Sequence, residues 1–141
     1  MSRALHEVID GIVHEPTQTE GRGVDLTLAD VYAVAAPGRV DFGGGELEAA
    51  ELEPVETSLR NPDDDYEWWN LEVSQYLLAY NESLDTPTDR EFVLQTRDEV
   101  LARGAFHPTL HLTELQRVPF VVGGGGIRLK ENARVSTLLE A

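Results

Sequence analysis

Strand-like patterns near the two ends of the chain are the feature that most constrains its fold. Towards the C-terminal end, the segment GIRLKENARVSTLL holds two runs with apolar residues at mostly alternating positions, separated by the polar turn Lys130-Glu131-Asn132. Towards the N-terminal end, GVDLTL alternates in a similar way. A period of two is typical of strands that bury one face. The pattern predicts a small β-protein that these strands close.

Most of the intervening sequence also consists of strand-like segments. Short β-prone runs are separated by turn-forming residues: WWNLEV, QYLLAYN, EFVLQT, TLHLTEL and PFVV. This spacing predicts an all-β barrel or sandwich. Residues 3–13 differ, because their apolar side chains recur at helical spacing up to Gly11, and they predict one short leading helix. VLARGAF is ambiguous between a helical turn stopped by Gly104 and a bent strand.

Length predicts one domain over residues 1–141, since a chain of 141 residues can bury a core without disulfides or metals. Within it, residues 46–65 are acidic and contain Pro54 and Pro62. We expect this stretch to be a surface excursion that contains one edge strand around residues 52–55. Gly123 to Gly126 predict a permissive hairpin turn, with a backbone nest for anions as the alternative.

Charge narrows the possible partners. The chain has 26 acidic and 11 basic residues and a formal net charge of −15, which would repel nucleic acids and anionic membranes. Because 41% of the residues are hydrophobic, we expect a folded domain with an acidic shell suited to high salt; the alternative is a surface that selects basic partners. The chain has no cysteine and no apolar run of membrane-spanning length. His6, Glu7 and Asp10 interrupt any export signal, so a cytoplasmic protein is predicted.

Five segments, in order, resemble a known family. They are QTEGRGVDLTLADVYAV, PGRVDF, NLEVSQYLLAYNESLDTPTD with its turn at Pro87, LQTRDEVLARGA, and FVVGGGGIRLKENARVSTLL. Spanning roughly residues 16–139, they resemble the dUTPase and dCTP deaminase superfamily, particularly its archaeal members. The resemblance implies a dUTPase-like β-barrel of the distorted jelly-roll type, assembled as a homotrimer with triphosphate sites at the subunit boundaries.

Two residues of this chain stand at motif positions of that family. Asp25 takes the place of the first-motif Asp, and Arg97 that of the Arg in an Arg-Ser-Ser phosphate-binding motif. The resemblance implies a Mg²⁺-bound triphosphate, with Asp25 as a partner of the metal and Arg97 as a planar phosphate ligand. The alternatives are a strand-end carboxylate that accepts backbone hydrogen bonds and an ordinary surface arginine.

The chain departs from the family pattern after Arg97. Asp98 and Glu99 replace two serines, so groups that only accept hydrogen bonds when ionised stand where hydroxyls would donate to phosphate. A later Arg is shifted by one place to Arg103, before Gly104, and both remain candidate substrate-binding residues. Asp98 and Glu99 are candidate catalytic carboxylates that a metal would bridge to phosphate.

The third family motif, which supplies a water-activating Asp and a base-stacking aromatic ring, is not legible between residues 106 and 120. His107, His111 and Glu114 are the acid–base candidates there, and Glu114 is the candidate for a deaminase-type base. The alternative is that TLHLTEL is an amphipathic strand. The two histidines would lie roughly 13 Å apart on a strand, too far to chelate one ion.

Two functions follow from these observations. The first is an enzyme: a Mg²⁺-dependent dUTP diphosphatase or a dCTP deaminase acting on deoxynucleoside triphosphates. The second is a catalytically degenerate homologue that serves as a nucleotide-binding or protein-interaction module.

Overall fold

The computed structural model describes residues 4–85 and 90–141, which form an all-β fold, as the sequence predicted. The expected turn at Pro87 lies outside the described residues. The described strands are β1 (Ile9–Asp10), β2 (Val24–Ala36), β3 (Glu51–Pro54), β4 (Trp68–Leu71), β5 (Ser74–Tyr80), β6 (Ser83–Leu84), β7 (Phe92–Thr96), β8 (Ala105–Phe106), β9 (Leu110–Leu112), β10 (Val118–Val122), β11 (Ile127–Lys130) and β12 (Arg134–Glu140). The helical elements are the 3₁₀ turn η1 (Leu5–Val8), α1 (Glu15–Gln18) and α2 (Asp98–Leu101).

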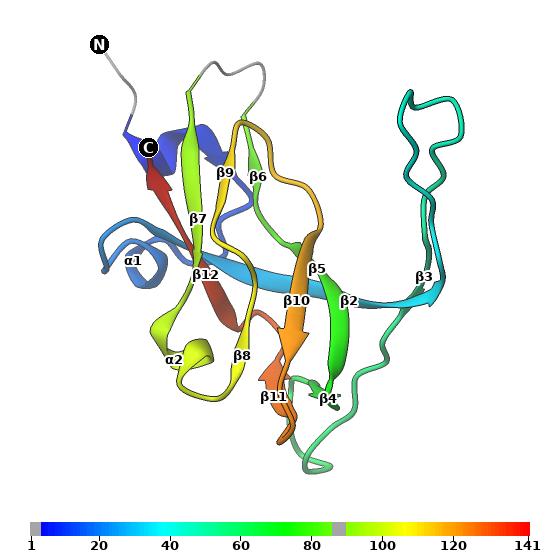
Figure 1. Ribbon diagram of the computed structural model, residues 1–141. Coiled ribbons are helices and arrows are strands. Elements are labelled where there is room, and N and C mark those ends of the chain that lie inside the picture. Colours follow the sequence, from blue (N-terminus) through cyan, green and yellow to red (C-terminus); the bar gives the residue numbers. More distant parts are fainter. Residues whose placement is uncertain (1–3, 86–89) are drawn as a thin grey trace.

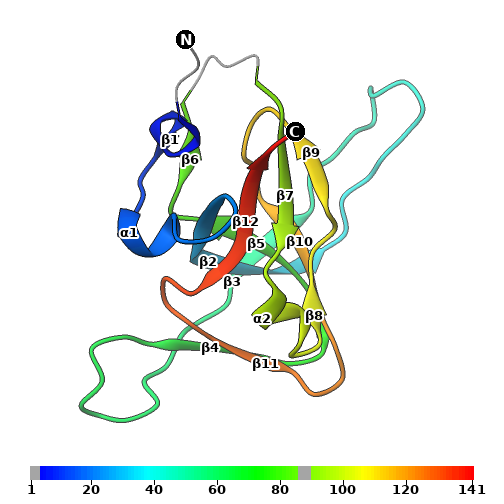
Figure 2. The same cartoon turned by 90° about the vertical axis from the view of Figure 1, so that its left-hand side faces the viewer.

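Strand β2 is the organising element of the sheet. Its first half pairs with β12, and its second half pairs with β5 and β3, so one long strand crosses the molecule (Figure 1). The main sheet has the order β8-β10-β5-β2-β12-β7-β9, with β3 added beside β2. Two further antiparallel pairs, β1 with β6 and β4 with β11, lie apart from it. Figure 2 shows the β4–β11 pair beneath the curled main sheet.

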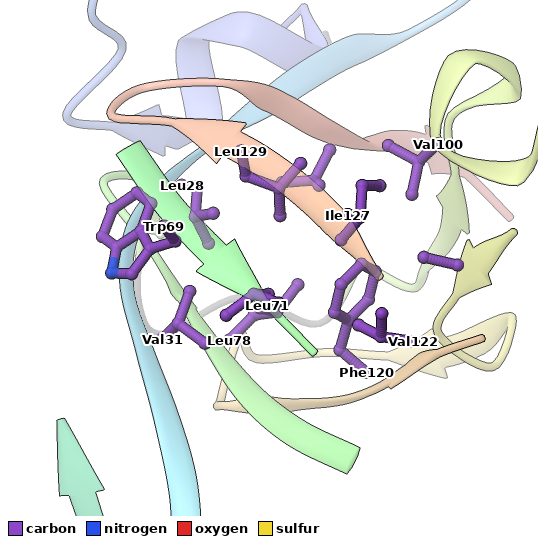
Figure 3. Packing of buried hydrophobic residues seen from close by; sticks show 12 residues of the cluster. Leu28, Val31, Trp69, Leu71, Leu78, Val100, Phe120, Val122, Ile127 and Leu129 are labelled. Atoms are coloured by element: carbon purple, nitrogen blue, oxygen red, sulfur yellow. The ribbon is translucent and has the colours of Figure 1, made fainter. Parts of the chain in front are cut away.

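The core consists of two apolar clusters. One contains Leu28, Trp69 and Phe120 and lies between the main sheet and the β4–β11 pair (Figure 3). The other contains Phe92 and Leu138 and lies towards the β1–β6 pair. The alternation read from the closing segment places its apolar side chains here, because successive residues of a strand face opposite sides. Those buried as expected are Ile127, Leu129, Val135 and Leu138.

The leading helix predicted over residues 3–13 is reduced, within the described residues, to the 3₁₀ turn Leu5–Val8. A single 3₁₀ turn is followed at once by Ile9–Asp10, which pairs antiparallel with Ser83–Leu84. Gly11 then turns the chain at a φ of +85°, and a Cβ there would lie 2.6 Å from the carbonyl oxygen of Asn81. Pairing with a distant strand therefore overrides the helical spacing, which is a weak determinant by itself.

The ambiguous segment VLARGAF combines both alternatives. Helix α2 covers its beginning, Gly104 reverses the chain at a φ of +86°, and Ala105–Phe106 then forms β8. In the acidic stretch, β3 lies about where an edge strand was expected, and with β2 it builds an arm that projects from the sheet (Figure 1). Within residues 4–85 and 90–141, no helix has the length and apolar character needed to cross a membrane.

Candidate functional site

A cleft of about 260 Å³ opens where β2, β12 and β7 lie side by side and the chain turns into α2. Its walls combine carboxylates, guanidinium groups and uncharged polar groups. The lining residues are Glu20, Gly21, Arg22, Asp25, Gln95, Thr96, Arg97, Asp98, Glu99 and Thr137. Segments from the beginning, the later part and the end of the sequence therefore meet at this one place.

Asp25 is the central carboxylate of the cleft and is only 4% exposed. Its Oδ1 accepts a hydrogen bond from Thr137 Oγ1 at 2.7 Å. Its Oδ2 lies 3.1 Å from Arg134 Nη1 and 3.5 Å from Arg97 Nε. The β2–β12 register pairs Asp25 directly with Thr137, so strand pairing brings these side chains together. Both carboxylate oxygens are thus engaged by groups of the same chain.

Arg97 stands at the N-cap position of α2, where its side chain makes no capping hydrogen bond. The side chain is 18% exposed. The backbone N–H of Arg97 donates to the carbonyl of Val135 at 3.0 Å, which ties the turn to β12. One side of its guanidinium contacts Asp25, while Nη2 lies 2.7 Å from Glu99 Oε2. Glu99 therefore occupies the side of the Arg97 guanidinium that faces away from Asp25, although the Glu99 side chain is 59% exposed.

Arg134 is a second cation of this cluster, and the sequence analysis did not identify it. Its Nη1 lies between Asp25 Oδ2 and Glu20 Oε1, at 3.1 Å and 3.0 Å. It also donates to the carbonyl of Thr17 at 3.2 Å. Arg134 begins the closing strand β12, which pairs with the strand that carries Asp25. The contact between Arg134 and Asp25 depends on the register of that pairing, which the sequence does not reveal.

The other predicted site residues are divided between places. Asp98 is exposed in the cleft, and its carboxylate has no partner within the described part of the chain. Arg103 and Gly104 do not line this cleft; Arg103 points into a different cavity. Glu114 is exposed outside the cleft and accepts a hydrogen bond from Gln116.

A second cavity of about 470 Å³ adjoins the first and shares Gln95, Thr96 and Asp98 with it. Its remaining lining is more apolar: Leu101, Phe106, His107, Pro108 and Thr109. The two cavities together form a surface with a charged end and an end that carries an exposed aromatic ring.

His107 closes the inner side of this second cavity and is only 3% exposed. Its Nδ1 lies 2.7 Å from the carbonyl of Pro108, so this nitrogen carries the proton and Nε2 accepts from Ser136 Oγ at 2.7 Å. Ser136 in turn accepts from the hydroxyl of Tyr80 at 2.6 Å. Burial lowers the pKa of His107, and burial raises the pKa of Tyr80. The ring is therefore held neutral in a buried chain of hydrogen bonds.

The carboxylates and histidines of the described chain are too scattered to form a metal site. Within the ranges 4–85 and 90–141, no three or more His, Asp or Glu side chains are grouped so that they could hold an ion. Asp25, the predicted metal partner, has both oxygens engaged by Thr137 and by arginines. The described side chains by themselves therefore do not build a cage for Mg²⁺.

The curled all-β sheet holds Asp25 against Arg97, the two residues through which the sequence resembles the dUTPase superfamily. No protein-family model matches the chain. It is 27% identical over 142 residues to the Probable deoxyuridine 5'-triphosphate nucleotidohydrolase of Methanosarcina acetivorans, across 97% of this chain and 80% of that protein. The proteins of the same name from Methanosarcina mazei and Methanococcoides burtonii are 24% and 25% identical, across 97% and 94% of this chain and 80% and 77% of their own lengths. These relatives confirm the resemblance to the dUTPase superfamily.

Proposed function

We propose that this protein is a dUTP diphosphatase-like hydrolase, which binds a deoxynucleoside triphosphate in the cleft and releases pyrophosphate. The names of its relatives support this reaction in preference to deamination of dCTP. The observation that carries the proposal is the convergence of Asp25, Arg97 and the unpartnered carboxylate of Asp98 on one cleft.

Arg97 is the phosphate-facing cation in this proposal, because it lines the cleft. Arg134 does not line the cleft and acts through its contact with Asp25. A planar guanidinium matches the oxygens of a phosphate, and Asp25 orients both arginines from below. A triphosphate would replace Glu99 at Arg97 Nη2, and because the Glu99 side chain is largely exposed, its release into solvent costs little. Asp25 thus acts as a positioning residue, while Arg97 contacts the substrate.

Asp98 is the proposed general base. Its free carboxylate takes a proton from a water molecule as the water attacks a phosphorus atom, and pyrophosphate leaves with the bonding electron pair. Glu114 has no such role here because it lies outside the cleft. The adjoining cavity with Phe106 and Pro108 is the proposed place for the base and sugar.

Magnesium has a limited role in this proposal. The described side chains do not form a set of ligands that could hold Mg²⁺ by themselves. We therefore expect Mg²⁺ to bind together with the triphosphate, as its counter-ion. We also propose a cytoplasmic location, because His6, Glu7 and Asp10 interrupt any export signal.

A homotrimer remains part of the proposal. Apolar side chains on the projecting β2–β3 arm support self-association, because Val40, Phe42 and Leu47 are exposed to solvent in the single chain. The mass in solution, measured by sedimentation equilibrium, tests the assembly.

The decisive experiment offers the folded protein dUTP, dCTP and other deoxynucleoside triphosphates with Mg²⁺, in high salt. Pyrophosphate is detected with added pyrophosphatase, and ammonia is measured in parallel. We expect pyrophosphate from dUTP, and Asp98→Asn should lower kcat by about 10²-fold or more while thermal stabilisation by dUTP persists. Asp63→Asn, in the acidic excursion, is the matched control.

Three other outcomes would contradict the proposal. Ammonia from dCTP would identify a deaminase. Thermal stabilisation by dUTP without any product would identify the degenerate binding module. An Asp98→Asn variant as active as the control would remove Asp98 from the mechanism.

A further inference from the structure

A cavity of about 810 Å³ lies away from the cleft, between the β4–β11 pair and the glycine turn that joins β10 to β11. It is lined by Asn70, Leu71, Glu72, Val73, Arg103, Gly124, Gly125, Gly126, Ile127 and Arg128. It shares no lining residue with the cleft around Asp25.

The charged side chains that line this cavity are mainly basic, whereas the chain as a whole is acidic. Arg103 and Arg128 both line it, opposed by the single carboxylate of Glu72, in a chain with a formal net charge of −15. Arg128 is exposed and has no hydrogen-bond or ionic partner among the residues described. Arg103 is held by one hydrogen bond, from Nη1 to the carbonyl of Glu99 at 2.9 Å, so its other N–H groups stay available. The cavity is a locally basic site on an acidic protein.

The glycines of the turn divide into two kinds. Gly123 and Gly126 are required by the fold, because a Cβ would lie 2.8 Å from the carbonyl oxygen of Gly104 and 2.7 Å from that of Leu71. Gly126 also has a φ of +70°. At Gly124 and Gly125, a Cβ would meet nothing within 4 Å, and neither residue has a positive φ. Nothing in the fold accounts for glycine at these two positions.

The backbone at these positions is open to a ligand. The N–H groups of Gly124 and Gly125 donate to no other group in the described ranges, whereas those of Gly123 and Gly126 are bonded to Gly104 and Gly123. Backbone amides that a side chain does not cover, in a cavity that two arginines also line, are donors suited to phosphate oxygens. The absence of side chains lets a ligand approach the backbone closely.

We propose that this cavity is a second, anion-binding site that takes a phosphate-bearing small molecule. Arg103 and Arg128 contact the phosphate oxygens from the two sides, and the turn at Gly124 and Gly125 supplies backbone N–H groups. Val73 and Ile127 add an apolar wall that accommodates a non-ionic part of the ligand. The site is distinct from the cleft around Asp25, and it does not depend on catalysis there.

The test uses inorganic pyrophosphate as the probe, with binding to the intact protein measured by calorimetry at low ionic strength, where charge contacts are least screened. The Arg97→Ala background weakens the cleft, so that the second site is observed separately. In that background we expect saturable binding, which Arg128→Gln weakens about tenfold or more. Gly125→Ala should also weaken it without lowering the Tm, because the added methyl group has free space in the fold.

Arg39→Gln is the matched control, since it removes the same charge from the projecting arm, where the exposed Arg39 side chain pairs with Glu48 and donates to the carbonyl of Glu46. Equal weakening by Arg39→Gln would show a general charge effect and overturn the site. Binding unchanged by both Arg128→Gln and Gly125→Ala would overturn it as well, as would the absence of saturable binding. Hydrolysis of dUTP is assayed separately, so failure of the cleft mechanism and failure of this site are distinguishable.

Discussion

Arg97 lies in contact with Asp25, its Nε 3.5 Å from the carboxylate Oδ2, although the two residues come from different sequence motifs. Strand β12 explains the contact, because it pairs with β2 on one side and with β7 on the other. Asp25 and the residue before α2 are thereby carried to the same end of three adjacent strands. The pair is mostly buried, so it has consequences for stability as well as for binding.

Asp25→Asn should destabilise the fold by about 2 kcal/mol, because it leaves two guanidinium groups facing a neutral amide in a buried position. The free energy of unfolding from urea titration measures this effect. Asp63→Asn, at an exposed position, should change it by less than about 0.5 kcal/mol. If the two variants were equally stable, the carboxylate would not organise the cluster.

Thr137→Val should cost about 1.5 kcal/mol, because it removes the hydroxyl that donates to Asp25 Oδ1 while keeping a β-branched side chain on the strand. Thr137→Ser keeps the donor and should lose less stability than the valine variant. Thermal unfolding of both variants under one set of conditions makes the comparison. The reverse order would show that packing of the methyl group, and not the hydrogen bond, determines the effect.

His107 should make the fold less stable as the solution becomes acidic. Burial lowers the pKa of His107 below the ordinary value of 6.5, so the unfolded chain binds a proton at a pH where the folded ring does not. The contribution of this residue is complete above pH 6.5 and is lost as the pH falls towards the folded pKa. His107→Gln should therefore flatten the dependence of unfolding free energy on pH between about 7.5 and 5.5.

Exposed His111 provides the comparison for this pH dependence. His111→Gln should leave the slope as it is in the wild-type chain. A slope that both substitutions reduce equally would show that burial of His107 is not its cause.

Glu82→Gln should lower the free energy of unfolding by about 2 kcal/mol. The buried Glu82 carboxylate accepts three hydrogen bonds: from the backbone N–H and the hydroxyl of Thr27, and from the amide of Gln18. A glutamine side chain in its place would direct its own NH₂ group at one of these three donors, so that hydrogen bond would be lost. Guanidinium-induced unfolding compares this variant with Glu53→Gln on the exposed β3, which should match the wild type.

The strands were the most predictable part of the fold. The alternation at Ile127 and Leu129 is visible in the sequence, and both residues are buried as that pattern requires. In β12, Val135 and Leu138 are also buried, but a register shift between Arg134 and Ser136 breaks the strict alternation. The leading helix is shorter than predicted because Ile9 pairs with Leu84, a residue far away in the sequence that no local pattern identifies as its partner. In the site, Asp25 and Arg97 were found through motif resemblance, whereas Arg134 was missed because its importance depends on strand register.

The sequence by itself determined that this chain is an acidic, cysteine-free, all-β protein with a dUTPase-like order of segments, because strand periodicity and composition are local properties. Only the tertiary structure decided that Asp25 is enclosed by Thr137, Arg97 and Arg134, that Asp98 has no partner among the described residues, and that Arg103 lies in another cavity. These relationships follow from which strands are neighbours and in which register. Pairing between segments far apart in the chain sets both, through the burial of their shared apolar faces.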